Sequence, residues 1–149
     1  MLKIHFLGTG TSQGIPVIGS NHPVCLSPNP KDKRLRVSIL IQWEHANVVV
    51  DCGPDFRQQM LRVNCETLDA VLFTHEHSDH AQGVDVLLRQ RQIPVFANAL
   101  TREALSHKMK STIEWKIFHS GQEFALGNLA VNTWTVNNMY ATQMQKGRV

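Results

Sequence analysis

The eight residues FTHEHSDH, numbered 73–80, gather three histidines and an aspartate within six consecutive positions. His75 and His77 are separated by a single residue, so in an extended loop their rings point to the same side. Asp79 and His80 follow at once. Imidazole nitrogens and carboxylate oxygens are the ligands that suit zinc, manganese or iron at a hydrolytic centre. The spacing therefore favours a metal site.

The segment before this motif supports the same interpretation. LDAVLFT, residues 68–74, is a nearly continuous apolar run of the kind found in strands that are buried on both faces. The histidines therefore follow the C-terminal end of a buried strand, where α/β proteins commonly place their sites. The alternative is a polar loop that happens to be rich in histidine, and the spacing of the motif directly after a buried strand argues against it.

Strand patterns alternate with helix patterns along the rest of the chain. Strands are expected at 2–7, 37–43, 46–52, 68–74, 94–97, 114–118, 122–126 and 129–136. Helices are expected from about Pro54 to Val63, at 81–91 and at 101–110. A segment rich in Gly, Pro, Ser and Asn at 8–34 is expected to be a long, functional loop. This order predicts α/β layering in a single domain, 1–149.

Composition narrows the class of protein and its partners. With 42% hydrophobic and 18% charged residues, the chain has the composition of a soluble globular protein. Its net charge of +3 suits a small anionic substrate and lacks the strong positive charge of a nucleic-acid binder. No apolar run approaches the roughly 18 residues of a membrane span. The three cysteines form no disulfide framework, so we expect a cytoplasmic protein without a membrane partner.

Four motifs together resemble a known family. They are LGTGTSQGIPVIG at 7–19, DKRLR at 32–36, VVVDCGPDFRQQML at 48–61 and FTHEHSDH at 73–80. The last resembles the metal-binding motif of the metallo-β-lactamase fold, and the others resemble its PhnP-like branch. That branch is similar to phosphoribosyl cyclic phosphate phosphodiesterases and related to transfer-RNA 3′-processing nucleases. The resemblance extends from residue 1 to about residue 136.

The resemblance implies a four-layered αββα sandwich with two divalent metals, zinc or manganese, at the edge between its sheets. It implies that His75 and His77 hold one metal and that Asp79, which we also expect to act in catalysis, and His80 hold the other. Asp51 would support the metal loop from behind, although a buried aspartate that caps local backbone groups is an equal alternative. The implied reaction is metal-assisted hydrolysis of a phosphodiester, in a small cyclic phosphate or a related ester.

Three further metal ligands of a complete family member, two histidines and a bridging aspartate, have no counterpart here. LAVNTWTVNN, 129–138, places Asn138 where the first histidine is expected, and 139–149 contain no His, Asp or Glu. We therefore expect the first half of a sandwich that lacks its C-terminal part and holds at most one metal ion. The alternatives to an enzyme are a non-catalytic half-domain with weak metal binding and a subunit completed by another chain. Self-association is expected through uncovered apolar side chains such as those of 129–136.

Weaker candidates lie in the long loop. Its first turn contains backbone and hydroxyl groups that could contact a phosphate: Thr9, Gly10, Thr11 and Ser12. The alternative for this stretch is a tight turn after the first strand. His22 and Cys25 are weak candidates for a structural zinc site, because Ser20, a poor ligand, precedes them where PhnP-like members often have Cys-x-Cys-x-x-Cys. The tryptophans are expected in the core: Trp43, Trp115 and Trp134.

Overall fold

The computed structural model describes four ranges of the chain: 1–83, 92–109, 113–127 and 129–136. The chain divides into two compact units, Met1–Ile117 and Phe118–Val149. The expectation of a single domain over 1–149 stays a prediction. Most of the helix expected at 81–91 and the position of Asn138 lie outside the described residues.

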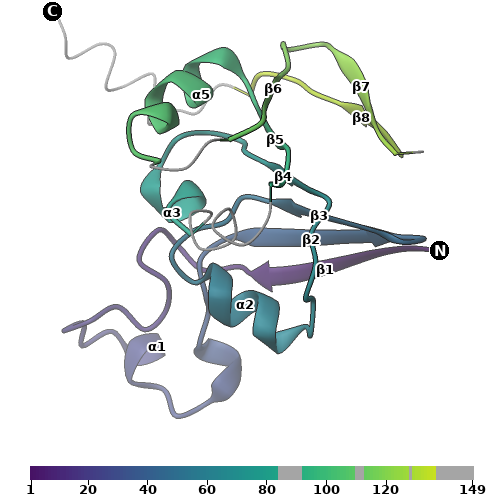
Figure 1. Ribbon diagram of the computed structural model, residues 1–149. Coiled ribbons are helices and arrows are strands. Elements are labelled where there is room, and N and C mark those ends of the chain that lie inside the picture. Colours follow the sequence, from purple (N-terminus) through teal and green to yellow (C-terminus); the bar gives the residue numbers. More distant parts are fainter. Residues whose placement is uncertain (84–91, 110–112, 128, 137–149) are drawn as a thin grey trace, which may run out of the picture. The chain divides into compact units, whose positions relative to one another are not determined.

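The first unit is built on a six-stranded sheet with the strand order β1-β2-β3-β4-β5-β6 (Figure 1). Its strands are β1 Leu2–Gly8, β2 Ser38–Trp43, β3 Ala46–Val50, β4 Ala70–Leu72, β5 Val95–Ala97 and β6 Trp115–Ile117. The first three strands are antiparallel neighbours, whereas β3, β4, β5 and β6 run parallel. The carboxyl ends of the parallel strands therefore meet at one edge of the sheet.

Three described helices cover one face of this sheet. They are α2 Phe56–Arg62, α3 Ser78–Ala81 and α5 Ala99–Ser106. The strands bury alternate side chains against these helices. The core contains side chains from the sheet, Leu7, Leu40, Val49, Val71, Phe73, Val95 and Ala97, and from the helices, Phe56, Met60, Ala81 and Leu105. Each large apolar side chain buried in this way contributes about 1.5–3 kcal/mol to folding. The apolar side chains that alternate along the strands thus form one core with those of the helices.

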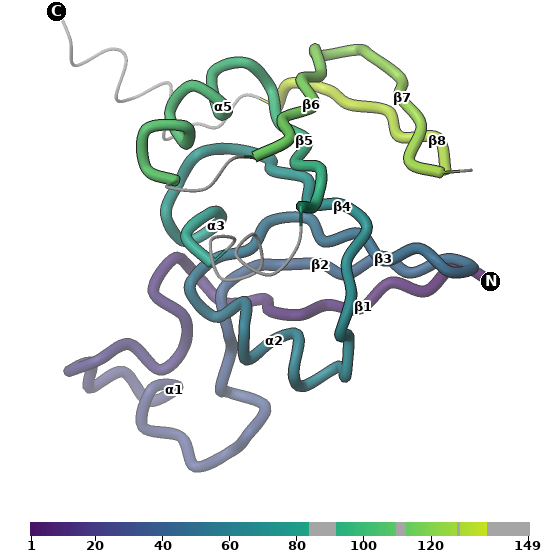
Figure 2. The backbone as a smooth tube through the Cα atoms, viewed as in Figure 1, coloured from purple at the N-terminus to yellow at the C-terminus, as the bar shows by residue number. Residues whose placement is uncertain are grey.

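The long loop between β1 and β2 extends beyond the carboxyl end of β1 and carries a short helix, α1 Pro23–Leu26, and the 3₁₀ turn η1 Pro30–Asp32 (Figure 2). Its start packs closely against its own end. A Cβ atom added to Gly8 would lie 1.9 Å from the carbonyl oxygen of Arg36, and the backbone of Gly10 forms a bridge with Arg36. Only glycine permits this approach of two backbones.

The described part of the second unit is a hairpin of β7 Glu123–Leu126 and β8 Leu129–Asn132. The strand expected over 129–136 ends at Asn132, so the second half of that prediction is wrong. The hydroxyl of Thr133 donates to the carbonyl oxygen of His119 at 2.9 Å and so ties the chain to the preceding turn. Trp134 is 74% exposed, which contradicts its expected place in the core.

The remaining elements follow the sequence closely, with differences at their ends. The strand expected at 68–74 is regular only over Ala70–Leu72. Helix α5 begins at Ala99, two residues earlier than expected, because the side chain of Asn98 accepts the N–H of Thr101 at 2.9 Å and caps the helix. None of the helices in the described residues has the length and apolar character of a membrane span.

Candidate metal centre

The histidine-rich loop lies where β4 ends and α3 begins. The N–H of Phe73 still donates to the carbonyl oxygen of Phe96 on the neighbouring strand at 2.8 Å, after which the chain leaves the sheet. His77 precedes α3, and its carbonyl oxygen accepts the N–H groups of His80 at 3.0 Å and Ala81 at 3.1 Å. The loop is therefore held at both ends by backbone hydrogen bonds.

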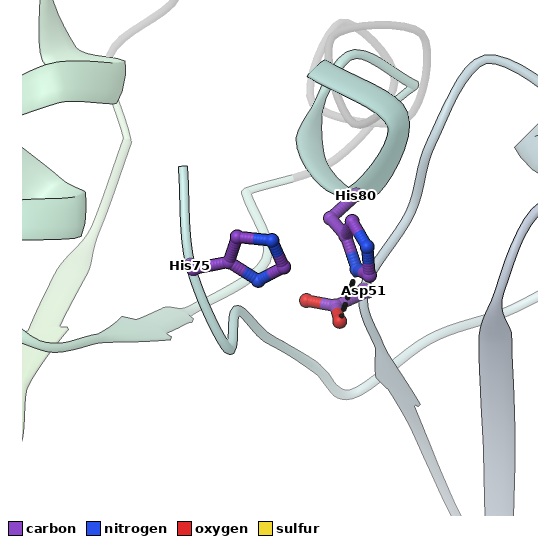
Figure 3. Close-up of side chains that lie close together, drawn as sticks. All are labelled: Asp51, His75 and His80. Atoms are coloured by element: carbon purple, nitrogen blue, oxygen red, sulfur yellow. Dashed lines mark hydrogen bonds and ion pairs between the residues drawn. The ribbon is translucent and has the colours of Figure 1, made fainter. Parts of the chain in front are cut away.

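Asp51 follows the last residue of β3 and lies beneath this loop (Figure 3). Its N–H donates to the carbonyl oxygen of Leu72 at 2.9 Å, and its own carbonyl oxygen accepts the hydroxyl of Ser38 at 2.7 Å. Its φ angle of 58° lies in the left-handed region, which aspartate adopts more readily than most residues. The residue is only 3% exposed, so its carboxylate faces the loop and not the solvent.

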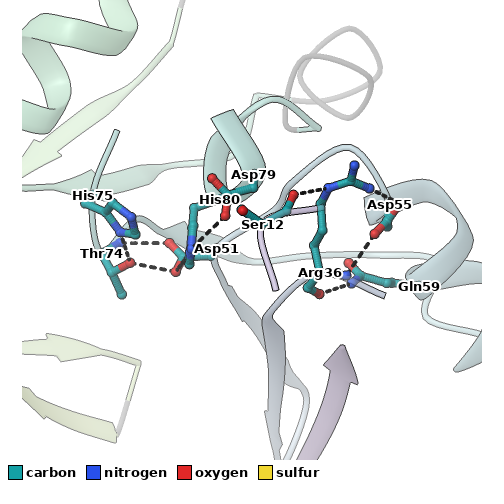
Figure 4. Close-up of polar contacts among 9 residues, drawn as sticks. All are labelled: Ser12, Arg36, Asp51, Asp55, Gln59, Thr74, His75, Asp79 and His80. Atoms are coloured by element: carbon teal, nitrogen blue, oxygen red, sulfur yellow. Dashed lines mark hydrogen bonds and ion pairs between the residues drawn. The ribbon is translucent and has the colours of Figure 1, made fainter. Parts of the chain in front are cut away.

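The carboxylate of Asp51 accepts three hydrogen bonds from the loop (Figure 4). Oδ1 accepts the N–H of Thr74 at 2.9 Å, and Oδ2 accepts the hydroxyl of Thr74 at 2.6 Å. Oδ2 also lies 2.8 Å from Nδ1 of His80. These bonds use three of the carboxylate's roughly four lone-pair positions. Ligand-type atoms of Asp51, His75 and His80 lie within 4.8 Å of one another, but the engagement of Asp51 favours a supporting place in that group.

The same hydrogen bonds assign the tautomers of two histidines. The hydroxyl of Thr74 donates its proton to Asp51, so it accepts the proton on Nδ1 of His75, which lies 2.9 Å away. Nδ1 of His80 likewise donates to Asp51. In their neutral forms both imidazoles therefore carry the lone pair on Nε2, which in His80 faces the carboxylate of Asp79. A histidine that donates one ring N–H to a carboxylate or hydroxyl and offers the other nitrogen is the arrangement typical of metal ligands.

The other expected ligands lie next to these two. Nε2 of His80 is 3.4 Å from Oδ2 of Asp79. Two ligand atoms that bind the same tetrahedral zinc ion at about 2.0–2.1 Å lie about 3.3 Å from each other. The ring of His75 lies 4.1 Å from that of His80 and 4.6 Å from that of His77, between centroids. His77 is exposed, whereas the other three are partly buried. The contacts among the four are thus pairwise, and within the described residues the group of three ligand atoms closest together is that of Asp51, His75 and His80, so a metal shared with His77 or Asp79 stays a prediction.

The electrostatic surroundings of the two partly buried rings differ. The hydrogen bond with Asp51 raises the pKa of His80 above its usual value, and the negative charges of Asp51 and Asp79 add to this effect while burial opposes it. Burial, followed by the positive charge of His80, lowers the pKa of His75. His75 is therefore held neutral, and His80 is the ring at which a proton competes with a metal.

Two glycines that the sequence did not single out allow the loop to sit on the end of β3. A Cβ atom added to Gly53 would lie 1.8 Å from the carbonyl oxygen of Asp79, and one added to Gly83 would lie 2.0 Å from that of Gly53. The N–H of Cys52 donates to the carbonyl oxygen of His80 at 2.7 Å. Burial raises the pKa of the Cys52 thiol well above its usual value, so this cysteine is a packing residue.

The first part of the 9–12 loop is engaged in its own turn. The N–H of Gly10 donates to the carbonyl oxygen of Leu35 at 2.8 Å, and the hydroxyl of Thr9 accepts from Arg34 at 2.8 Å. The carbonyl oxygen of Thr11 accepts a backbone N–H at 2.9 Å. Two of these contacts hold the stretch against Arg34 and Leu35 at the far end of the long loop, and a phosphate contact here stays a prediction.

Ser12 connects the loop to a second polar network (Figure 4). Its carbonyl oxygen accepts Nε of Arg36 at 2.8 Å, and Nη1 of Arg36 forms an ion pair with Oδ1 of Asp55 at 2.9 Å. Nε2 of Gln59 donates to the carbonyl oxygen of Arg36 at 2.8 Å. Arg36 therefore joins the long loop to α2 and to Asp55, the residue before that helix.

His22 and Cys25 lie on one turn around α1. Nδ1 of His22 accepts the N–H of Val24 at 3.3 Å, and Sγ of Cys25 accepts the N–H of Val17 at 3.4 Å. The bond from Val17 is the main cause that lowers the pKa of Cys25. In the ranges that the structure describes, no cluster of three metal-ligating side chains includes either residue. A structural zinc site here therefore has two ligands, where such sites use four.

Comparison with known proteins places this fold and loop in a family. Residues 46–147 match the family described as the beta-lactamase superfamily domain. The chain belongs to this superfamily. The expected metallo-β-lactamase type of α/β fold is confirmed by this match and by the solved structure of a diphosphatase from the PhnP family, which has a TM-score of 0.79 and 34% identity.

Each of these relatives is longer than the matched part. The chain covers 54% of the diphosphatase, with 85% of its own residues aligned. A ribonuclease Z from Methanopyrus kandleri is 29% identical over 87% of this chain and 44% of that protein. An octanoyltransferase from Porphyromonas gingivalis is 41% identical over 72% of this chain but only 23% of that protein. The chain thus spans about half of the diphosphatase and less than half of the other two relatives.

Proposed function

We propose that the chain supplies the metal-binding loop of a metal-dependent hydrolase that acts on phosphodiesters. The observation that carries the proposal is a set of three hydrogen bonds. Through them Asp51 fixes Nδ1 of His80 directly and Nδ1 of His75 by way of Thr74. Packing alone does not require a fixed ring orientation, whereas a metal ligand does, so these imidazoles are suited to hold a cation. The hydrolase names of the diphosphatase and the ribonuclease among the relatives support the reaction type.

Four side chains are proposed as metal ligands: His75, His77, Asp79 and His80. Nitrogen and carboxylate ligands suit zinc or manganese, and a bound divalent ion supplies an activated water and polarises a phosphoryl oxygen. Asp51 is proposed to orient the rings without binding the metal. Asp79, beside His80 and partly exposed, is proposed to contact the reacting centre. Because only four ligands are proposed, we expect at most one divalent metal ion per chain.

The proposed substrate is a small anionic phosphoester, such as a cyclic phosphate. The mild positive charge of +3 suits a small anion. The names of the relatives leave two sizes of substrate to compare, a small phosphate compound and a polynucleotide. A cytoplasmic location is proposed because the three cysteines, Cys25, Cys52 and Cys65, are all free.

A second candidate is a metal-binding half that is completed by another polypeptide. The observation that favours it is the count of four proposed ligands, which gives only two to each of two metals. In this case the isolated chain binds metal through the same loop but shows little hydrolysis, because catalytic zinc sites use three protein ligands and an open position at each metal.

One pair of measurements tests these proposals. Zinc or manganese content after dialysis reports binding, and hydrolysis of a generic aryl phosphodiester, a ribose cyclic phosphate and a short single-stranded RNA reports the substrate. His75→Ala and His80→Ala are expected to remove the metal, whereas His45→Ala, in an exposed turn, retains it. Faster hydrolysis of RNA than of the small esters would overturn the proposed substrate. Unchanged metal content in both loop variants would overturn the proposed site.

A further inference from the structure

Two arginines near the end of the long loop differ in whether their charge is compensated. Nη1 of Arg36 forms an ion pair with Oδ1 of Asp55 at 2.9 Å, and its Nε donates to the carbonyl oxygen of Ser12 (Figure 4). Arg34, two residues earlier, is exposed. In the part of the chain that the structure describes, no carboxylate lies within ion-pair distance of its guanidinium. The charge of Arg34 is therefore uncompensated.

Arg34 is nevertheless held in place. Its backbone N–H donates to the carbonyl oxygen of Ile15 at 2.8 Å, and its carbonyl oxygen accepts the N–H of Ile15, also at 2.8 Å. Nη1 of its side chain donates to the hydroxyl of Thr9 at 2.8 Å. An exposed arginine ordinarily loses rotamer freedom when it binds a ligand, and these bonds remove part of that freedom beforehand. The guanidinium is thus partly preorganised.

The contact with Thr9 leaves donors for a ligand. A guanidinium has five N–H groups, and the hydroxyl oxygen of Thr9 accepts one from Arg34. The other four meet no acceptor in the described ranges of the chain. They include the edge formed by Nε and Nη2, whose two parallel N–H groups match two oxygens of a phosphate. The Thr9 hydroxyl accepts from Arg34 through its oxygen, so its own proton remains available for donation.

Arg34 and Thr9 lie at the same edge of the sheet as the histidine-rich loop. β1 and β3 both run antiparallel to β2, so their carboxyl ends lie at one edge. Gly8 pairs with Ser38, whose hydroxyl donates to the carbonyl oxygen of Asp51 at 2.7 Å. Neighbouring strands are about 4.8 Å apart, so Thr9, which follows Gly8, is on the order of 10 Å from Asp51. An anion that approaches the metal loop therefore also approaches Arg34.

We propose that Arg34, tethered by Thr9, binds the negatively charged phosphate of the substrate and so selects charged phosphoesters over neutral esters. This inference rests on the proposed function, because it takes the substrate of the metal loop to be a phosphoester. The charges around Arg34 support it. Residues 31–36, KDKRLR, contain four basic residues and one acidic residue, so the local potential attracts anions. A neutral ester forms no ion pair with the guanidinium and gains little from this site.

Titration of the ¹⁵N-labelled full chain with dimethyl phosphate, an anionic phosphodiester, tests the proposal. We expect the Nε–H signal of Arg34 and the backbone N–H signal of Thr9 to shift, with a dissociation constant of about 1 mM. Trimethyl phosphate, the uncharged analogue, should leave both signals unchanged. Arg34→Ala is expected to weaken binding of dimethyl phosphate, followed at Thr9, by about tenfold or more.

The matched control is Lys31→Ala, which removes the same charge from an exposed side chain of the same loop. It is expected to weaken binding by less than about twofold, because a distant exposed charge contributes little. Circular dichroism establishes that the variants are folded. If Arg34→Ala does not fold, Arg34→Gln keeps a side-chain donor for Thr9 but removes the charge.

Zinc content separates this proposal from the proposed function. The metal-free chain should bind dimethyl phosphate, and Arg34→Ala should retain zinc. If the ester binds at Arg34 but the zinc-loaded chain hydrolyses no phosphoester, the proposed reaction is wrong and the anion site is confirmed. An Arg34 signal that dimethyl phosphate leaves unchanged would overturn the proposal. Equal affinities of the folded Arg34 variant and Lys31→Ala would overturn it as well.

Discussion

Nδ1 of His80 lies 2.8 Å from Oδ2 of Asp51, although the two residues are 29 positions apart in the chain. The carboxylate is buried and fixed by Thr74, so it can hold the imidazole in a single orientation. This contact leaves Nε2 of His80 beside the carboxylate of Asp79. The relationship converts a histidine-rich stretch of sequence into a defined set of candidate metal ligands.

Replacement of Asp51 by asparagine is expected to weaken zinc binding by about 10- to 100-fold, because the amide cannot accept all three hydrogen bonds. Asparagine also adopts the left-handed backbone conformation of this position, so backbone strain is not introduced. Competition with a zinc-binding dye measures the change. Glu103→Gln removes a charge from the exposed side of α5 and serves as the control. Equal zinc affinity in both variants would contradict the supporting place of Asp51.

The hydroxyl of Thr74 is expected to matter for metal affinity more than for folding. Thr74→Val keeps the shape of the side chain but removes the bonds to Asp51 and to Nδ1 of His75. Zinc affinity should fall by about tenfold, since both rings lose part of their orientation. Thr74→Ser keeps the hydroxyl and should bind zinc like the unchanged chain, as isothermal titration calorimetry can show. A serine variant as weak as the valine variant would show that the hydroxyl is not the cause.

Gly53 is expected to tolerate no larger residue. A Cβ atom here would lie 1.8 Å from the carbonyl oxygen of Asp79, so Gly53→Ala must displace the metal loop. We expect a loss of about 1–3 kcal/mol in the free energy of unfolding and weaker zinc binding. Gly127→Ala provides the comparison. It strains a backbone with φ of 61° but meets no atom within 4 Å, so it should lower stability without changing zinc affinity.

Added zinc should make the stability of the chain more sensitive to acid. In the metal-free chain the raised pKa of His80 contributes stability that is fully present below the unfolded pKa of about 6.5 and is lost as the pH rises through the folded pKa. The lowered pKa of His75 acts in the opposite direction, so the two contributions oppose each other. With zinc, protonation of His80 competes with the metal, and stability falls as the pH is lowered. Thermal unfolding between about pH 5 and pH 8 with and without zinc measures both trends. If stability depends on pH in the same way with and without zinc, protons and zinc do not compete for His80.

Much of the fold and the position of the site could be predicted because they depend on local patterns. The apolar run at 68–74 predicted a buried strand and FTHEHSDH predicted the loop after it. Asp51 contacts both Nδ1 of His80 and the backbone N–H of Thr74, so its support of a metal loop stays a prediction. These patterns succeed because burial and ligand chemistry both select residue types at fixed spacings.

The connections between distant segments could not be predicted. Thr74 was assigned to the end of a strand, but its hydroxyl lies between Asp51 and His75. The close approach of Gly53 to the backbone of Asp79 depends on how two segments meet, and no local period records it. Trp134 matched a strand pattern, yet β8 ends at Asn132 and the ring is exposed.

The nitrogen atoms of the histidines provide the most direct test of this account. Long-range proton–nitrogen NMR spectra of the ¹⁵N-labelled chain, recorded before and after zinc is added, report which ring nitrogen carries a proton and which one binds the metal. We predict that His75 and His80 keep a proton on Nδ1 and that zinc shifts only their Nε2 signals. Zinc bound through Nδ1 of either ring, or spectra of both rings that zinc leaves unchanged, would contradict the proposal that Asp51 and Thr74 orient these histidines as metal ligands.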